Sequence, residues 1–148
     1  MNLIKRIFTK EQKQNKPPEK PSVEKTPYEI IGGEAGAHNL SKRFYDIMEQ
    51  DEYARPLLEL HPQPLDRIRF VFFEFLSGWL GGPDLFTEKY GHPMLRKRHL
   101  PFLIDEELRN QWIYCMNKAL DIEIDNPLLR QNLKKSFLQL ATHMINHE

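Results

Sequence analysis

A chain of 148 residues with 40% hydrophobic side chains can form one domain around one core, and it leaves no room for a second enzyme domain. The formal net charge is zero, but residues 1–27 carry seven Lys/Arg against three Glu, which leaves 14 basic and 18 acidic side chains for the rest. This balance excludes a dedicated nucleic-acid binder, which would carry a basic face on its folded part. The single cysteine, Cys115, excludes an intrachain disulfide, and we expect a cytoplasmic protein.

Residues 1–27 are expected to form a flexible basic leader, because Lys, Gln, Glu and Pro dominate them and cannot bury enough apolar surface to offset the cost of ordering. The first eight residues place apolar and basic side chains at helical spacing, so a short amphipathic helix is the alternative there. We do not expect this segment to contact a membrane, since two helical turns bind weakly and no apolar run approaches the roughly 20 residues that cross a bilayer.

Residues 28–148 show a helical period and no alternation of period two, which predicts an all-α domain. A brief helix is expected over residues 28–31, ending at Gly32-Gly33, where the missing Cβ atoms permit a sharp turn. A second helix is expected over residues 34–50. Its apolar side consists of Leu40, Phe44, Ile47 and Met48, with Tyr45 at the margin.

After a proline-broken stretch, a third helix is expected over residues 65–80. Its apolar stripe consists of Leu65, Ile68, Phe72, Phe75 or Leu76, and Trp79. Phe70 and Phe73 widen the stripe, so this face needs more than one neighbour to cover it. Packing against other helices is the ordinary explanation of such a stripe, and a flat aromatic cofactor that covers part of it is the alternative.

The third helix ends at Gly81-Gly82-Pro83, and a loosely ordered segment with one short helical piece is expected up to His99. A fourth helix is expected over residues 105–121, where the first aspartate can cap free N–H groups. The last helix is expected over residues 126–144, with an Asn-Pro pair as its start signal. Four long helices with short connectors favour two antiparallel pairs that cross one another.

His99 is the candidate metal ligand, because a lone imidazole flanked by bases and apolar groups suits one axial bond to haem iron. A porphyrin also needs an apolar slot and cations near its propionates. Candidates for the slot are Leu95, Leu100 and Phe102, and those for the rim are Arg96, Lys97 and Arg98, with a hydroxyl from Tyr90. Taken alone, His99 is better explained as a partly exposed histidine in a basic loop.

Several short motifs follow one another in a fixed order along the chain. They are Gly32-Gly33-Glu34, Arg43-Phe44-Tyr45, Trp79-Leu80-Gly81-Gly82-Pro83, the run from Gly91 to Phe102, and the run from Arg109 to Met116. Together they resemble the group II truncated haemoglobins, the short globins of bacteria and plants, over about residues 28–146. The resemblance implies a two-over-two α-helical sandwich, a trimmed globin fold, with haem b between the helix pairs.

The resemblance also assigns roles to single residues. It implies that His99 is the proximal iron ligand, that Tyr45, His61 and Trp112 are distal hydrogen-bond donors to bound O₂, and that Ile68 and Phe72 are apolar distal neighbours. Each assignment has a plainer alternative: Tyr45 as a half-buried core tyrosine, Trp112 as packing, His61 as a loop residue. Direct coordination of ferric iron by Tyr45 or His61 is a further alternative.

The function that follows is binding of O₂ and other diatomic gases such as NO. Slow release through distal donors favours redox chemistry, detoxification of NO or peroxide, or sensing over bulk oxygen transport. The chain has no Gly-rich dinucleotide fingerprint, so we expect the electrons to come from an external reductase or a small reductant. We expect the protein to be a monomer or a weak dimer. The alternatives are a haem-free helical interaction module and, less favoured, a mononuclear metal site at His92 and His99.

Overall fold

The computed structural model describes residues 24–147, which form helices and contain no strand. In chain order the helices are α2 (Pro27–Ile30), α3 (Gly33–Gln50), the 3-10 helix η1 (Glu52–Ala54), α4 (Arg55–Glu59), α5 (Asp66–Trp79), α6 (Leu85–Tyr90), α7 (Leu95–His99), α8 (Glu106–Glu123) and α9 (Pro127–His143). The predicted all-α fold is confirmed. None of these helices has the length and apolar character of a membrane span. Most of the expected leader, including its alternative amphipathic helix, lies outside the described residues.

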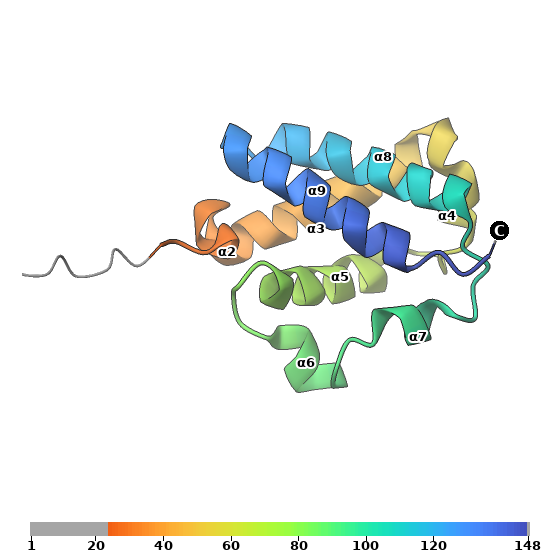
Figure 1. Cartoon of the computed structure of the whole chain (residues 1–148), viewed down its shortest axis with the longest axis horizontal. Coiled ribbons are helices and arrows are strands. Elements are labelled where there is room, and N and C mark those ends of the chain that lie inside the picture. Colours follow the sequence, from red (N-terminus) through yellow and green to blue (C-terminus); the bar gives the residue numbers. More distant parts are fainter. Residues whose placement is uncertain (1–23, 148) are drawn as a thin grey trace, which may run out of the picture.

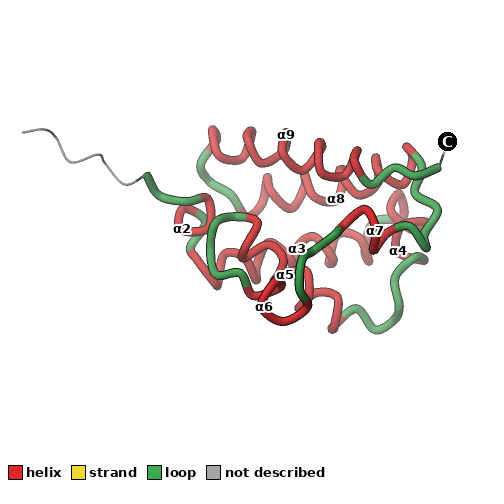
Figure 2. Tube along the Cα trace, turned by 60° about the horizontal axis from the view of Figure 1, so that its bottom comes forward, coloured by secondary structure: helices red, strands yellow, loops and turns green. Residues whose placement is uncertain are grey.

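The four long helices form two packed pairs. Helix α9 returns along α8, and this pair lies against α3 and α5 (Figures 1 and 2), in agreement with the contacts of α3 with both α5 and α8. The short helices α6 and α7 lie below α5 in the view of Figure 1, on the side away from α8. The expected arrangement of two pairs is therefore present, and the short helices close one side of it.

Capping side chains fix where the helices begin. Asp105 accepts a hydrogen bond from the Leu108 N–H at 2.8 Å and starts α8, while Asn126 accepts one from the Leu129 N–H at 2.9 Å and starts α9. Both caps are as predicted. Helix α2 begins at Pro27, one residue earlier than expected, because Thr26 caps it.

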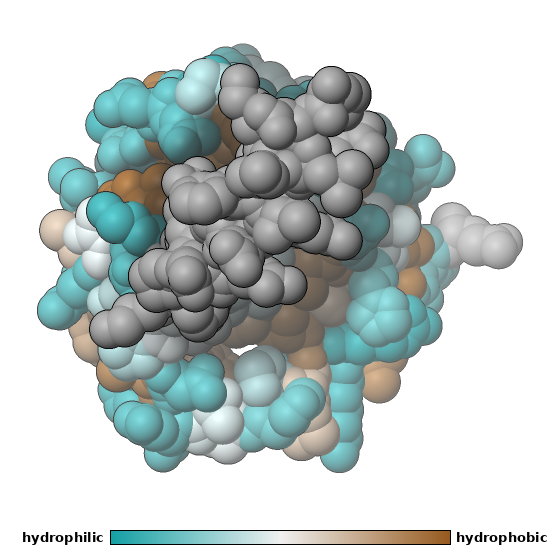
Figure 3. Space-filling model, turned by 60° about the vertical axis from the view of Figure 1, so that its left-hand side comes forward, coloured by the Kyte–Doolittle hydropathy of each residue, from teal (hydrophilic) through white to brown (hydrophobic). Residues whose placement is uncertain are grey.

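The core lies between the two helix pairs. Its largest fully buried side chains include Phe44, Phe137, Leu40, Met48, Leu76, Met116 and Leu120. Each such side chain contributes about 1.5–3 kcal/mol by leaving water. Trp79 stacks on Phe137 with ring centres 4.3 Å apart, which joins the end of α5 to α9. On the face that Figure 3 shows, hydrophilic residues surround small apolar areas.

Two stretches contain more helix than the sequence predicts. The proline-broken stretch holds η1 and α4, and the segment before His99 holds α6 and α7 in place of one short piece. Helices of three to six residues are too short to show a period, so the sequence alone does not reveal them. On α5, Phe73 is buried and stacks on His38, whereas Phe70 is 47% exposed, so the far margin of the predicted stripe is not covered.

Gly36 in α3 makes the turn between α2 and α3 possible. A Cβ atom at this position would lie 2.0 Å from the backbone oxygen of Ile31, at the end of α2. In an ordinary helix interior, Gly→Ala stabilises by about 1 kcal/mol. We expect Gly36→Ala to do the opposite and lower the free energy of unfolding by about 1–3 kcal/mol, as an overpacked site does. Urea unfolding measures the change.

The matched control is Gly78→Ala in α5. A Cβ there would meet the side-chain oxygen Oδ1 of Asp84 at 2.4 Å, and Asp84 is exposed and can rotate away. Gly78→Ala should therefore cost clearly less than Gly36→Ala. Equal losses for the two variants would contradict the backbone clash as the cause.

Candidate functional site

An apolar cavity of about 370 Å³ lies between α5, α7 and the α8–α9 pair, within the size range of small-molecule sites. It is lined by Tyr45, Leu57, Leu60, His61, Pro62, Ile68, Val71, Phe72, Phe75, Phe86, Leu95, Arg98, His99, Phe102, Ile104, Leu108, Arg109, Trp112, Leu140, Ala141 and Met144. Most of these side chains are apolar, so the few polar groups among them decide what the cavity can bind.

The structure brings most of the predicted site residues to this cavity. Those present in its lining are Tyr45, His61, Ile68, Phe72, Leu95, Arg98, His99, Phe102 and Trp112. Arg96 and Tyr90 are not among them. Arg96 donates a hydrogen bond to the His143 carbonyl at 2.9 Å, and the Tyr90 hydroxyl donates to Glu74 at 2.9 Å. Their polar groups are therefore used elsewhere, and the structure does not bring them to the predicted rim.

His99 is the last residue of α7. Its Nδ1 is hydrogen-bonded to the backbone carbonyl of Leu95, one helical turn earlier. Because a carbonyl oxygen only accepts, Nδ1 carries the proton and Nε2 keeps its lone pair. The Asn146 side chain donates to the carbonyls of Phe102, at 2.9 Å, and of His99, at 3.3 Å, and so ties the segment after α7 to the end of the chain. With Nδ1 donating in this way, the neutral form of the ring presents Nε2 as its free donor atom, the arrangement common in metal-binding histidines.

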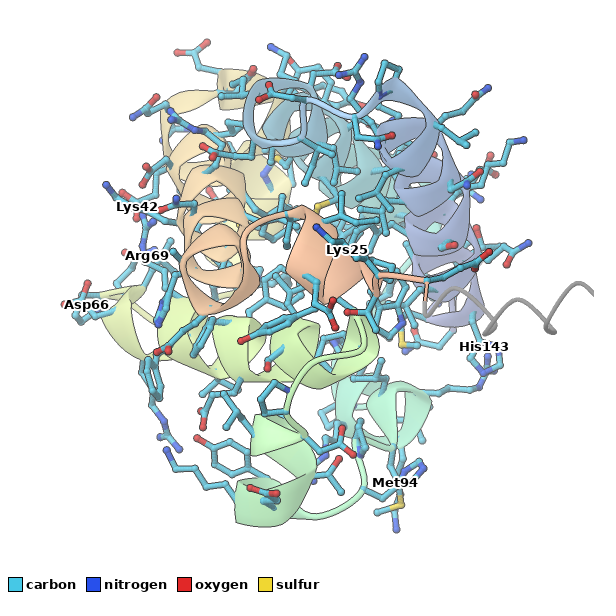
Figure 4. The ribbon with its side chains drawn as sticks, turned by 90° about the vertical axis from the view of Figure 1, so that its left-hand side faces the viewer. Lys25, Lys42, Asp66, Arg69, Met94 and His143 are labelled. Atoms are coloured by element: carbon cyan, nitrogen blue, oxygen red, sulfur yellow. The ribbon has the colours of Figure 1, made fainter. Side chains whose placement is uncertain are left out.

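Tyr45 projects from α3 into the other side of the cavity and is 4% exposed. Burial raises the pKa of its hydroxyl well above the ordinary value, although the Arg69 guanidinium partly opposes this. The phenol is therefore protonated at neutral pH and can donate a hydrogen bond. Arg69 lies 5.9 Å from the ring centre, and Figure 4 shows it between α5 and α3 beside Lys42, whose carbonyl accepts a hydrogen bond from it.

His61 follows α4 and repeats the geometry of His99. Its Nδ1 donates to the Leu57 carbonyl at 2.9 Å, so the neutral ring carries its lone pair on Nε2. Burial lowers the pKa of His61 below the ordinary value; the bond to the Leu57 carbonyl partly opposes this, and the nearby His99 lowers the pKa further. At neutral pH His61 is thus a hydrogen-bond acceptor on its free nitrogen. This differs from the donor role that the sequence resemblance implies.

Trp112 reaches the cavity from α8. Its ring lies 5.0 Å from that of Phe44 and 6.2 Å from that of Phe72, so apolar neighbours hold the indole in place. The indole N–H is a donor only. The rings of Tyr45 and His61 have their centres 5.8 Å apart. The three predicted distal residues therefore line one cavity, and two of them are donors at neutral pH.

Sequence reasoning missed Arg109 as a cavity residue. Arg109 lies on α8 one turn before Trp112, and its guanidinium contacts Glu106 and Thr142 at the edge of the cavity. The three-residue spacing from Trp112 on a predicted helix is the signal that could have placed it there. With Arg98, it brings a second guanidinium to the cavity lining.

The donor set and the walls fit a porphyrin: apolar walls, one neutral imidazole with a free Nε2, and guanidinium groups for two carboxylates. They do not fit a mononuclear protein metal site. Within residues 24–147 no group of three or more His, Cys, Asp or Glu side chains is placed to hold a metal ion. The buried Cys115, whose pKa burial raises to about 12, is a core thiol.

Comparisons with known proteins identify the family to which this fold belongs. The Bacterial-like globin family matches residues 26–146. The chain is 38% identical over 121 residues to the group 2 truncated hemoglobin YjbI of Bacillus subtilis, which covers 81% of this chain and 88% of that protein.

Two solved structures extend the comparison to three dimensions. A cold-adapted truncated hemoglobin from the Antarctic marine bacterium Pseudoalteromonas haloplanktis TAC125 is 73% identical with a TM-score of 0.83, covering 84% of this chain and 100% of that one. A group II 2-on-2 hemoglobin from Agrobacterium tumefaciens is 39% identical with a TM-score of 0.83, covering 87% and 100%. With its two helix pairs and its histidine-lined apolar cavity, the chain belongs to the group II truncated haemoglobins, a globin family that binds haem and small gases.

Proposed function

We propose that this protein binds haem b through Nε2 of His99 and holds a diatomic gas, O₂ or NO, on the side of Tyr45, His61 and Trp112. The observation that carries the proposal is the hydrogen bond from Nδ1–H of His99 to the Leu95 carbonyl, which leaves Nε2 as the basic nitrogen in an apolar cavity. Bound there, haem would supply an iron atom that binds a diatomic gas and exchanges electrons, and His99 would hold it.

The walls of the cavity hold the ring by apolar contact. Ile68 and Phe72 of α5 form one wall, and Leu95 and Phe102 extend it on the side of His99. Arg98 and Arg109 are the cations for the propionates, because a guanidinium grips a carboxylate with two parallel donors. Arg96 and Tyr90 are left out of this proposal, since neither residue lines the cavity.

The distal residues set how fast a gas leaves. The Tyr45 hydroxyl and the Trp112 indole N–H are the donors to the gas, and the lone pair on His61 Nε2 can accept from a water molecule. Each donated bond is worth roughly 0.5–1.5 kcal/mol net, so two bonds slow release by a factor of about five to 150. Slow release suits redox chemistry or sensing better than bulk transport.

Oxidation of NO to nitrate and reaction with peroxide are the specific activities we propose for such a site. Tyr45 and His61 carry an exchangeable proton and a free lone pair near one another, so they can move a proton at the distal side. The electrons would come from a separate reductase or a small reductant, with the protein acting as a monomer or weak dimer in the cytoplasm. The alternative is a haem-free helical interaction module, and it explains neither the free Nε2 of His99 nor the apolar cavity.

Replacement of His99 tests the proposal directly. His99→Ala should abolish the Soret band of protein purified from haem-sufficient cells, because the only proposed iron ligand is gone. His99→Gly should recover a Soret band when imidazole is added. The control is His92→Ala in the same segment, which should keep its spectrum. A wild-type chain that folds but stays colourless with hemin supplied would support the interaction module.

Removal of the phenol donor should speed gas release. Tyr45→Phe should raise the O₂ dissociation rate by about two- to tenfold, the effect of losing one net hydrogen bond. Stopped-flow displacement of O₂ by CO measures the rate. Tyr53→Phe is the matched control, since Tyr53 is 43% exposed and outside the cavity lining. An unchanged rate in Tyr45→Phe would remove Tyr45 from the proposed distal role.

The lowered pKa of His61 makes stability depend on pH. Above its ordinary value of 6.5 the ring is neutral in the folded and unfolded chain, and the full stability is present. As the pH falls from 6.5 toward the lower folded pKa, the unfolded chain takes up a proton that the folded chain refuses, so stability is lost. Urea unfolding at pH 7.5 and 5.5 should show this loss, reduced in His61→Gln and unchanged in the control His147→Gln, an exposed residue. Equal losses in all three proteins would contradict the assignment.

A further inference from the structure

Gln111 is a buried polar residue of α8 that the proposed gas site does not use. It is 3% exposed and lies next to Trp112, but it does not line the cavity. Its amide oxygen Oε1 accepts a hydrogen bond from the backbone N–H of Leu57 at 3.1 Å. A buried amide makes such a bond because leaving it unpaired would cost about 1–3 kcal/mol.

The bond fills a gap in the first turn of α4. The residue before this five-residue helix, Ala54, provides no side-chain cap. The Arg55 N–H donates to the Glu52 carbonyl and Pro56 has no N–H, so the Leu57 N–H is the first that needs an acceptor from elsewhere in the fold. Gln111 supplies one from a different helix. A helix as short as α4 is not stable by itself, and its position depends on such tertiary contacts.

Leu57 connects Gln111 to His61. Its N–H donates to Gln111, and its carbonyl accepts the Nδ1–H of His61 at 2.9 Å. The carbonyl bond selects the tautomer of His61 and thereby decides which ring nitrogen keeps the lone pair. Movement of Leu57 would weaken this bond, and the tautomer with its proton on Nε2 would then become more populated.

We propose that Gln111 is a positioning residue for His61: it fixes Leu57, and the Leu57 carbonyl fixes the imidazole with its lone pair on Nε2. The inference rests on the proposed gas site, because the ring so fixed faces that site. Helix α8 then holds the distal side in two ways, through Trp112 directly and through Gln111 by way of Leu57.

A second anchor keeps this segment folded when Gln111 is changed. Tyr114 of α8 donates its hydroxyl to Asp51 at 2.6 Å, and Asp51 caps η1 by accepting from the Tyr53 N–H at 3.0 Å. This contact holds the start of the η1–α4 segment to α8 independently of Gln111. Substitutions at Gln111 therefore change the orientation of Leu57 more than the fold.

The test is the tautomer of His61, read from the ¹⁵N shifts of its ring in the diamagnetic ferrous carbon monoxide form, with assignment by His61→Gln. The wild-type ring should show a protonated Nδ1 and a pyridine-type Nε2. Gln111→Met, which keeps the shape and removes the acceptor, should shift the tautomer ratio toward Nε2–H by roughly two- to tenfold, the effect of one net hydrogen bond.

Two further variants are controls. Gln111→Glu keeps an oxygen acceptor and should restore the wild-type ratio, and Gln131→Met, on the exposed side of α9, should leave it unchanged. If Gln111→Met does not fold, Gln111→Asn, whose amide stops one methylene short of Leu57, replaces it with the same expectation.

A folded Gln111→Met or Gln111→Asn that keeps the wild-type tautomer ratio would overturn the proposal, as would a wild-type ring protonated on Nε2. Failure of the proposed function gives a different result: hemin would not bind, and the same ¹⁵N measurement on the haem-free chain would still report the effect of Gln111 on His61.

Discussion

The hydrogen bond between the His99 ring and the Leu95 carbonyl is the interaction on which the site depends. It joins two residues of one short helix, so its geometry follows from the helical turn itself. It fixes the proton on Nδ1, and only then is Nε2 available as a metal ligand. In the proposed haem site the apolar walls and the guanidinium groups act together with this nitrogen, since His99 lines the same cavity.

The same device occurs a second time, at His61 and Leu57, again with a carbonyl four residues earlier. In each case an imidazole next to a short helix is oriented by the backbone of that helix. The long helices α3, α5, α8 and α9 provide walls and packing, whereas α4 and α7 provide the orientation of the rings. The long helices therefore provide most of the packing, and the short helices set the orientation of the two imidazole rings. A change in one short helix can reorient its ring while the packing of the core stays the same.

Much of the fold could be predicted from the sequence, because the long helices carry a strong period and their caps are local. Asp105 and Asn126 begin helices as their positions predict, and the proposed proximal and distal residues do meet at one cavity. The short helices could not be predicted, since a turn or two shows no period. The hydrogen bonds of Arg96 to His143 and of Tyr90 to Glu74 could not be predicted either, because they join residues that are 47 and 16 positions apart. The lone pair of His61 depends on a carbonyl whose position is known only in three dimensions.

The tie between Asn146 and the segment after α7 bears on how the protein is made. Leu140, Ala141 and Met144, at the end of α9, line the cavity, and the Asn146 side chain closes the segment that follows His99. A nascent chain can pack α3 against α5 while synthesis continues, but its cavity stays open on one side until Asn146 has left the ribosome. A cofactor would therefore meet the complete cavity only after α9 has been translated.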